Sequence, residues 1–265
     1  MPFPDSPRVI YKKNPLEQVI CQLRFPPILR IDTEPPAKYQ DAIRKEYPLF
    51  EERKGISLDL PNQLQEQLPP EFLRLLGSSD KKAYNFISID KQWTISFTRD
   101  FIALTTGRYT RWEEFKEYFK IPFETLLNEY SPALFSRVGL RYRNIIRKSE
   151  LGLQDISWSE LIQPYIAGPL SDSSELDNDC IVAMNSTVDI RLINNYGKVK
   201  IRHGFVEDKT TNEICYQIDS DFSTENIEEH DNAIERLHHF NRRAGRLFRW
   251  CITPKLHTAM EPEKI

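Results

Sequence analysis

The chain has 265 residues, of which 40% are hydrophobic and 28% are charged, so it can bury a full core as one large domain or as two fused units. Its net charge of −3 gives no overall attraction to nucleic acid or to an anionic membrane, and either contact would need a local basic patch. The sequence has no apolar run long enough to cross a membrane and no signal segment, which predicts a cytoplasmic protein with no membrane contact.

The chain begins with a proline-rich stretch, residues 1–15, that predicts an extended N-terminal arm. Residues 18–25 then alternate apolar and polar side chains, which is typical of a half-buried strand. A helix is expected over residues 37–50, because four apolar residues recur there at helical spacing. These four are Tyr39, Ile43, Tyr47 and Phe50.

Residues 51–80 are ambiguous, and a short edge strand over residues 56–60 is one interpretation. Three strands in close succession follow, and then a helix that Pro122 is expected to kink or split. The strands are predicted over residues 84–89, 93–99 and 101–106, and the helix over residues 111–130.

The second half is predicted to repeat this order, with a strand, a short helix capped by Ser157, a polar loop, three strands and a long helix capped near Ser223 or Thr224. The strand spans residues 137–146, the short helix 157–165, the loop 171–179, the three strands 180–193, 198–206 and 213–222, and the long helix 227–250.

The opening strands of the two halves also resemble each other residue by residue. When residues 16–28 are aligned with residues 135–145 without gaps, Leu23 matches Leu140 and Arg24 matches Arg141. This predicts an α+β fold of two pseudo-repeats, each a strand, a helix, three or four antiparallel strands and a helix. The first unit would span residues 16–133 and the second residues 134–265, packed as one globular body. Two such units form the saddle of TATA-binding-protein-like folds, and a helix-grip fold is the alternative.

The strand pattern places a set of charged side chains on the face of the sheet opposite the core, including Arg24, Arg141 and Arg143. One interpretation is a polar concave surface that binds a partner or nucleic acid. The other is a solvated face on which opposite charges pair across strands. Basic and acidic strands alternate in the second half, which favours pairing there, whereas Arg24 has no evident acidic neighbour in the sequence.

The last predicted helix separates an apolar face from a basic one. The side chains opposite its apolar face are His239, Arg242, Arg246 and Arg249. Guanidinium groups bind phosphates and carboxylates, so this stripe could meet nucleic acid or an acidic partner protein. A solvated amphipathic helix is the alternative explanation.

No catalytic, cofactor or metal signature accompanies these features. The sequence has no phosphate-binding glycine loop, no nucleophile elbow and no dinucleotide fingerprint. His238 and His239 are adjacent, so they point in different directions and do not form a metal pair. We therefore expect no enzyme activity, no cofactor and no metal.

Three segments resemble a sporadically distributed family of uncharacterised small prokaryotic proteins of similar length. They are residues 15–28 (PLEQVICQLRFPPI), 109–115 (YTRWEEF) and 237–253 (LHHFNRRAGRLFRWCIT). The resemblance covers nearly the whole chain and implies a bacterial protein carried on mobile or defence-linked gene clusters. It supplies no catalytic residues.

These observations lead to one main hypothesis and two alternatives. The main hypothesis is a non-enzymatic binding module that docks to another protein encoded nearby, as an accessory or regulatory component of a bacterial antiviral defence or toxin-linked system. The first alternative is a nucleic-acid-binding protein that uses the sheet face and the arginine-rich last helix. The second is an enzyme whose site is assembled from scattered residues.

Overall fold

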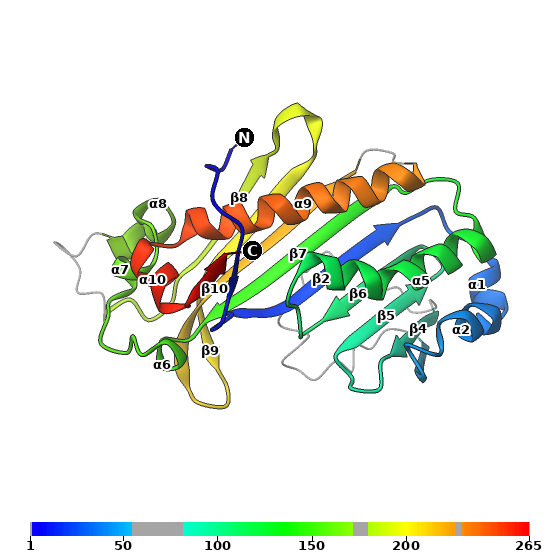
Figure 1. The fold of residues 1–265 in the computed structure, drawn as a ribbon, viewed down its shortest axis with the longest axis horizontal. Helices are drawn as coiled ribbons and strands as arrows, with labels where there is room; N and C mark the ends of the chain where they lie inside the picture. Colours follow the sequence, from blue (N-terminus) through cyan, green and yellow to red (C-terminus); the bar gives the residue numbers. More distant parts are fainter. Residues whose placement is uncertain (1, 55–81, 172–179, 226–228, 265) are drawn as a thin grey trace.

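The computed structural model describes residues 2–54, 82–171, 180–225 and 229–264, which form an α+β fold around one large antiparallel sheet (Figure 1). This confirms the predicted α+β class. The described part of the sheet has nine strands in the order β3-β4-β5-β6-β2-β7-β10-β9-β8. The strands are β2 (Leu16–Arg24), β3 (Leu49–Lys54), β4 (Lys82–Ile87), β5 (Trp93–Thr98), β6 (Phe101–Thr106), β7 (Arg137–Ile146), β8 (Asn185–Arg191), β9 (Lys198–Asp208) and β10 (Glu213–Thr224).

Two long helices, α5 (Trp112–Tyr130) and α9 (His230–Cys251), cover the same face of this sheet, with the short α2 (Ala37–Ile43) beside α5 (Figure 1). The other helices are α1 (Arg30–Thr33), α6 (Lys148–Leu151), α7 (Trp158–Leu161), α8 (Pro164–Ala167), α10 (Pro254–Ala259) and two 3-10 turns, Gly168–Ser171 and Ile193–Asn195. None of these described helices is both long and apolar enough to span a membrane.

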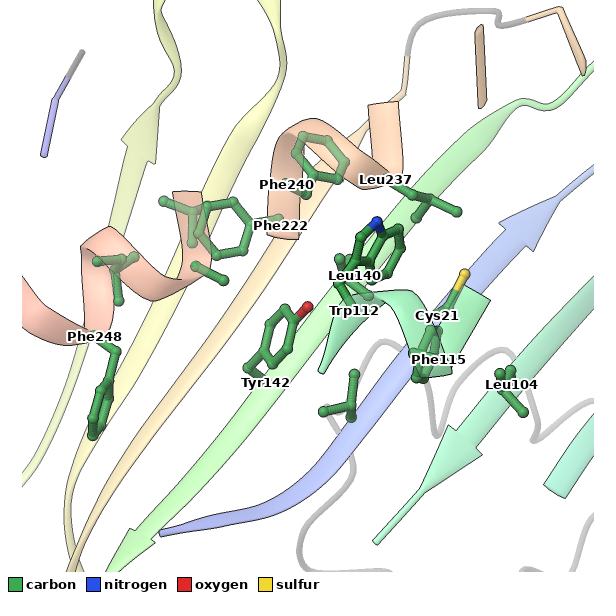
Figure 2. Close-up of a cluster of buried hydrophobic side chains, with 14 of the residues drawn as sticks. Cys21, Leu104, Trp112, Phe115, Leu140, Tyr142, Phe222, Leu237, Phe240 and Phe248 are labelled. Carbon is green, nitrogen blue, oxygen red and sulfur yellow. The ribbon is translucent and has the colours of Figure 1, made fainter. Parts of the chain in front are cut away.

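The core lies between the long helices and the sheet, and β2 and β7 pair at its centre. Cys21 lies opposite Leu140 and Leu23 lies opposite Val138, and all four side chains are fully buried. Figure 2 shows strand residues such as Leu140 close to side chains of both helices. Since successive strand residues point to opposite faces, the arginines that alternate with these apolar residues point away from the helices.

The two halves of the sheet have the same strand order. Outward from the centre, the first half runs β2, β6, β5, β4 and the second half runs β7, β10, β9, β8. In each half the long helix follows the strand that neighbours the central one, since α5 comes after β6 and α9 comes after β10. The first half has one additional outer strand, β3.

Helix α5 continues through Pro122, so of the two expected effects of this proline the split does not occur. Proline has no N–H, so the carbonyl oxygen of Tyr118, four residues earlier, loses its helical donor. The hydroxyl of Tyr47 donates a hydrogen bond to that oxygen at 2.8 Å, and the hydroxyl of Tyr39 donates to the carbonyl oxygen of Pro122 at 3.1 Å. Two tyrosines from the neighbouring segment thus stabilise the helix at its proline.

The predicted helix over residues 37–50 is wrong in its second half. Helix α2 ends at Ile43, and the chain enters β3 at Leu49. Pro48 explains the change, because it cannot donate to the preceding turn and it disfavours helical backbone at the residue before it. Tyr39, Ile43 and Tyr47 remain buried as the pattern predicted, whereas Phe50 lies on an edge strand.

The helix expected over residues 157–165 is interrupted. Ser157 caps α7 as predicted, accepting a hydrogen bond from the backbone N–H of Ser159 at 3.3 Å. Gln163 is extended because Pro164 follows it, so α8 starts as a separate helix.

Two further predicted boundaries in the second half are wrong. The last helix is not capped near residues 223–224, because Ser223 and Thr224 remain paired with β7 and Glu229 is the N-cap instead. The strand expected over residues 180–193 is reduced to β8. The strand considered over residues 56–60 and most of the loop over residues 171–179 lie outside the described residues.

The N-terminal arm is docked on the body. Phe3 is buried, with its ring centroid 5.4 Å from that of Trp250 at the end of α9. A few residues later, β1 (Val9–Tyr11) pairs with β11 (Pro262–Lys264). The arm therefore passes over α9 toward the C-terminus (Figure 1). Neither three-residue strand was predicted, since such short segments carry no periodic signal and their partners lie at opposite ends of the chain.

We expect Phe25→Ala to lower the free energy of unfolding by about 3–5 kcal/mol, because the buried ring would leave a cavity beside Phe135. Leu29→Ala is the matched control, since Leu29 is 66% exposed, and it should change stability by less than about 0.5 kcal/mol. Guanidinium unfolding followed by circular dichroism measures both variants. A loss below about 1 kcal/mol for Phe25→Ala would contradict the assigned core face.

Candidate functional site

Helix α9 separates its apolar residues from its basic residues. Leu237, Phe240 and Leu247 are fully buried against the sheet. At about 100° per residue, the basic side chains leave the helix in two adjoining groups, one on the outer face and one beside it. One flank carries Arg242, Arg246 and Arg249, and the other carries Arg236, His239 and Arg243.

A cavity of about 430 Å³ lies along the first flank of α9. Its walls come from four segments that are far apart in the sequence: the arm, the loop before α5, the middle of β7 and α9 itself. The arm and the adjoining start of β2 contribute residues 6–11, Asn14 and Leu16, the loop contributes residues 109–111, and β7 contributes Tyr142 and Asn144. From α9 the lining residues are His238, Asn241, Arg242, Ala244, Gly245, Arg246, Phe248 and Arg249. A cavity of this size can hold a small molecule or a few residues of a peptide.

The cavity is positively charged. Five arginines line it, and none of its described lining residues is acidic. The five are Arg8, Arg111, Arg242, Arg246 and Arg249. Two carboxylates outside the lining reach two of them. Asp5 Oδ1 lies 2.7 Å from Arg246 Nη1, and Arg8 donates two hydrogen bonds to Glu113, at 2.9 and 2.6 Å.

The pKa values of Glu113 and His238 are both lowered, as expected for groups beside arginines. The hydrogen bond from Arg8 lowers the pKa of Glu113 to about 2. Burial lowers the pKa of His238, and the nearby cations Arg242 and Lys116 lower it further. At neutral pH the carboxylate is therefore ionised and the imidazole is neutral.

The floor of the cavity is a hydrogen-bonded group of two phenols and an amide. The hydroxyls of Tyr109 and Tyr142 both donate to Asn241 Oδ1, at 3.0 and 2.9 Å. Burial raises the pKa of Tyr109 to about 12 and also raises that of Tyr142, so both phenols stay protonated at neutral pH. Both phenol hydrogens are used within this group, so the floor is neutral, and the preference of the cavity for a negatively charged ligand comes from its arginine rim.

Gly245 leaves open space in the wall formed by α9. A Cβ added at this position would have no heavy atom within 4 Å. A glycine inside a helix costs about 1 kcal/mol relative to alanine, so this position gives up helix stability where the helix borders the cavity.

His239 lies on the other flank, away from the cavity. The His239 ring stacks on the Tyr196 ring with 3.9 Å between centroids. The guanidinium groups of Arg236 and Arg243 lie 4.7 and 5.1 Å from the centroid of the Tyr196 ring. Arg243 is 4% exposed, and burial lowers its pKa. Stacking and cation–π contacts with Tyr196 account for this group, so His239 is not brought together with the arginines of the first flank.

The predicted arginines of the sheet face are mostly engaged within the sheet. Arg141 is 6% exposed and donates to both carboxylate oxygens of Asp219, at 2.7 and 2.8 Å. Burial alone would lower the pKa of Arg141, but the Asp219 carboxylate outweighs that effect and the pKa is raised. Arg143 donates to Gln217 at 2.8 Å. These contacts agree with the cross-strand pairing that the alternating charges favoured.

Arg24 differs from the other two. It is half-buried, and its buried Nε has no hydrogen-bond partner among the described residues. Burial lowers its pKa, and the carboxylate of Asp100 partly offsets this effect. The structure places Arg24 on the polar face of the sheet, whereas the cavity lies on the helix-covered face.

Of the predicted site residues, the fold gathers Arg242, Arg246 and Arg249 around one cavity. Only Arg242 is exposed, whereas Arg246 and Arg249 are half-buried. Arg249 also donates to the carbonyl oxygen of Ile252 at 3.3 Å, which satisfies a backbone acceptor at the end of the helix. Sequence reasoning missed Arg8, Arg111 and Asn241. The available signals were the basic residue in the proline-rich arm and the glycine inside the last helix.

No metal cluster was found among the described residues, where no group of three or more His, Cys, Asp or Glu side chains is positioned to hold an ion. Comparison of the chain with protein-family models, with curated proteins and with solved structures found no match. The function is therefore inferred from the sequence and the structure of this chain.

We expect Arg8→Ala to raise the pKa of Glu113 from about 2 toward its ordinary value of 4.5, because the guanidinium that stabilises the carboxylate is removed. The titration of the Glu113 carboxyl carbon, followed by NMR, measures the shift. Arg8→Lys is the matched control, since it keeps the charge and should raise the pKa less. An unchanged pKa in Arg8→Ala would show that the arm does not contact α5 in solution.

We expect Arg141→Leu to lower the free energy of unfolding by about 3 kcal/mol or more, because Asp219 is buried and would lose its bidentate partner. The double variant Arg141→Leu/Asp219→Leu should recover part of this loss, since it removes the buried carboxylate that only Arg202, at 3.6 Å, would otherwise compensate. Lys45→Leu, at an exposed site, is the control in the same urea titration. If Arg141→Leu is as stable as the wild type, Arg141 does not have the structural role assigned to it here.

Proposed function

We propose that the protein is a non-enzymatic binding module that docks to acidic side chains of a partner protein. The observation that carries this proposal is the group of five arginines around one cavity whose described lining contains no acid. These arginines come from the arm, the loop before α5 and α9, so the folded chain brings them together in advance of binding. Guanidinium groups bind carboxylates through two parallel hydrogen bonds, which favours acidic partners.

The partner is proposed to be encoded near this protein. The resemblance to a family on mobile or defence-linked gene clusters supports a role as an accessory or regulatory component of a bacterial antiviral defence or toxin-linked system. A scaffold that presents a binding cavity fits such a role, in which recognition is the protein's contribution.

We also infer that the scaffold is a duplicated unit that resembles the saddle of TATA-binding-protein-like folds. The matching strand order of the two halves and the equivalent positions of α5 and α9 support this inference. Two long helices on one face also favour it over a helix-grip fold, which has a single long helix. The alignment of Arg24 with Arg141 also matches Gln22 with Gly139, and these two residues lie opposite each other in the β2–β7 pair, which supports a two-fold relation there.

Nucleic acid is the second candidate, because phosphates bind arginines by the same chemistry. The sheet face is a poor phosphate surface, since Asp219 and Asp221 lie among its arginines. The first flank of α9 is then the surface to which phosphates would bind. Phosphate contacts release counterions and give a steep dependence of affinity on salt.

The test is a double charge reversal, Arg242→Glu with Arg246→Glu, which leaves Arg249 in its capping role. The probes are a fluorescein-labelled peptide of ten glutamates and a labelled single-stranded DNA of 20 nucleotides, followed by fluorescence anisotropy at two salt concentrations. We expect the wild type to bind the peptide and the variant to lose at least about tenfold in affinity, because the approaching surface becomes repulsive.

The control is Lys38→Glu with Lys45→Glu, which changes the net charge by the same amount at exposed sites that do not line the cavity. It should bind the peptide nearly as well as the wild type. Thermal unfolding of both double variants checks that α9 remains packed. An equal loss of peptide affinity in the two double variants would contradict the proposed site. Binding of the DNA but not of the peptide would favour nucleic acid as the ligand.

A further inference from the structure

The middle of the N-terminal arm, residues 4–8, is held much less firmly than its two ends. One end is fixed by buried Phe3 and the other by the pairing of β1 with β11. Between them, the described residues supply no backbone hydrogen bond to residues 4–7. The ion pairs of Asp5 with Arg246 and of Arg8 with Glu113 hold this stretch, and their side chains are about half or more exposed except for that of Arg246. Exposed ion pairs stabilise a structure only weakly.

The middle segment is extended and presents one carboxylate to α9, as a bound acidic peptide would. Pro4 and Pro7 favour extended backbone in the residues before them, and no helix or strand forms between Phe3 and Arg8. The carboxylate of Asp5 contacts Arg246, which is one of the five arginines of the cavity. The arm thus already places one carboxylate, on an extended chain, where the proposed function requires a partner's carboxylate to bind.

The arm does not fill the space that it covers. Ser6, Pro7 and Arg8 form one wall of the cavity, and the space beside Gly245 on the opposite helix is open. Arg242 and Arg111 also line this space, and Asp5 is not paired with either of them. A ligand with several carboxylates can therefore engage cations that the arm leaves available.

We propose that residues 4–8 hold the place of an extended, carboxylate-bearing segment of the partner. A carboxylate of this segment displaces Asp5 from Arg246, and the middle of the arm then moves away from α9. Phe3 and β1 keep the arm attached to the body. The inference rests on the proposed function and specifies it further, because it names the partner's docking element and makes Asp5 its competitor.

The test compares Asp5→Ala with Glu235→Ala, using the same labelled peptide of ten glutamates. Both variants remove one negative charge near α9, but only Asp5 contacts a cavity arginine, whereas Glu235 is exposed elsewhere on the helix. If Asp5 competes with the peptide, Asp5→Ala should bind about two- to fivefold more tightly than Glu235→Ala. Equal affinities would overturn the inference and leave the proposed function standing.

A second measurement follows the arm itself. Trypsin cleaves after Arg8, which is exposed but held by Glu113 and followed directly by β1. Saturating peptide should accelerate this cleavage several-fold, as judged by mass spectrometry of the released segment, because the lifted arm is more accessible. Glu113→Gln without peptide is the reference for an arm released at that point.

The outcomes separate the two ideas. Peptide binding that depends on Arg242 and Arg246, with unchanged cleavage and no effect of Asp5→Ala, supports the docking function and overturns the role of the arm. Peptide binding to Asp5→Ala but not to the wild type supports both. Absence of peptide binding to either protein overturns both.

Discussion

The antiparallel pairing of β2 with β7 is the contact on which the rest of this fold depends. It joins two smaller sheets into one and brings the apolar rows of both, Cys21 beside Leu140 and Leu23 beside Val138, to the same face. With that face shared, α5 and α9 cover one continuous core. A shift of one residue in this register would turn Arg141 and Arg143 toward the core and Leu140 away from it, at a large cost in burial. The cavity depends on the same register, because Tyr142 of β7 forms its floor.

Much of this fold could be predicted from the sequence, and the failures have physical causes. Alternating side chains identified the central strands because each strand places its apolar residues on one face and its polar residues on the other. Helical periodicity identified α9 but extended α2 too far, since the pattern through Phe50 ignores the effect of Pro48. The arm could not be predicted as a docked element. Its two anchors, Phe3 against Trp250 and β1 against β11, are contacts between opposite ends of the chain, which no local pattern records.

The arginines show why residue type alone did not define the site. Arg141 and Arg242 have the same side chain, but the register of β10 places Asp219 beside the first, whereas no carboxylate lies in the described wall beside the second. A paired and buried guanidinium contributes to the structure, because removing its partner would leave a charge without compensation. A guanidinium at the rim of an open cavity can exchange water for a ligand at little cost. The distinction lies in tertiary contacts, so the sequence identified the basic residues and left their roles open.

The arm also limits which ligands can occupy the cavity. Asp5 is tethered at both ends of its segment, so its carboxylate meets Arg246 at an effective concentration in the millimolar range or above. A single free carboxylate or phosphate ion competes poorly against such a contact, even though the contact itself is weak. A ligand gains only if it binds Arg246 together with Arg242 or Arg111, since each additional ion pair then forms within one complex. Selection for spaced negative charges on one extended chain thus follows from the tether, without any pocket shaped for a particular side chain.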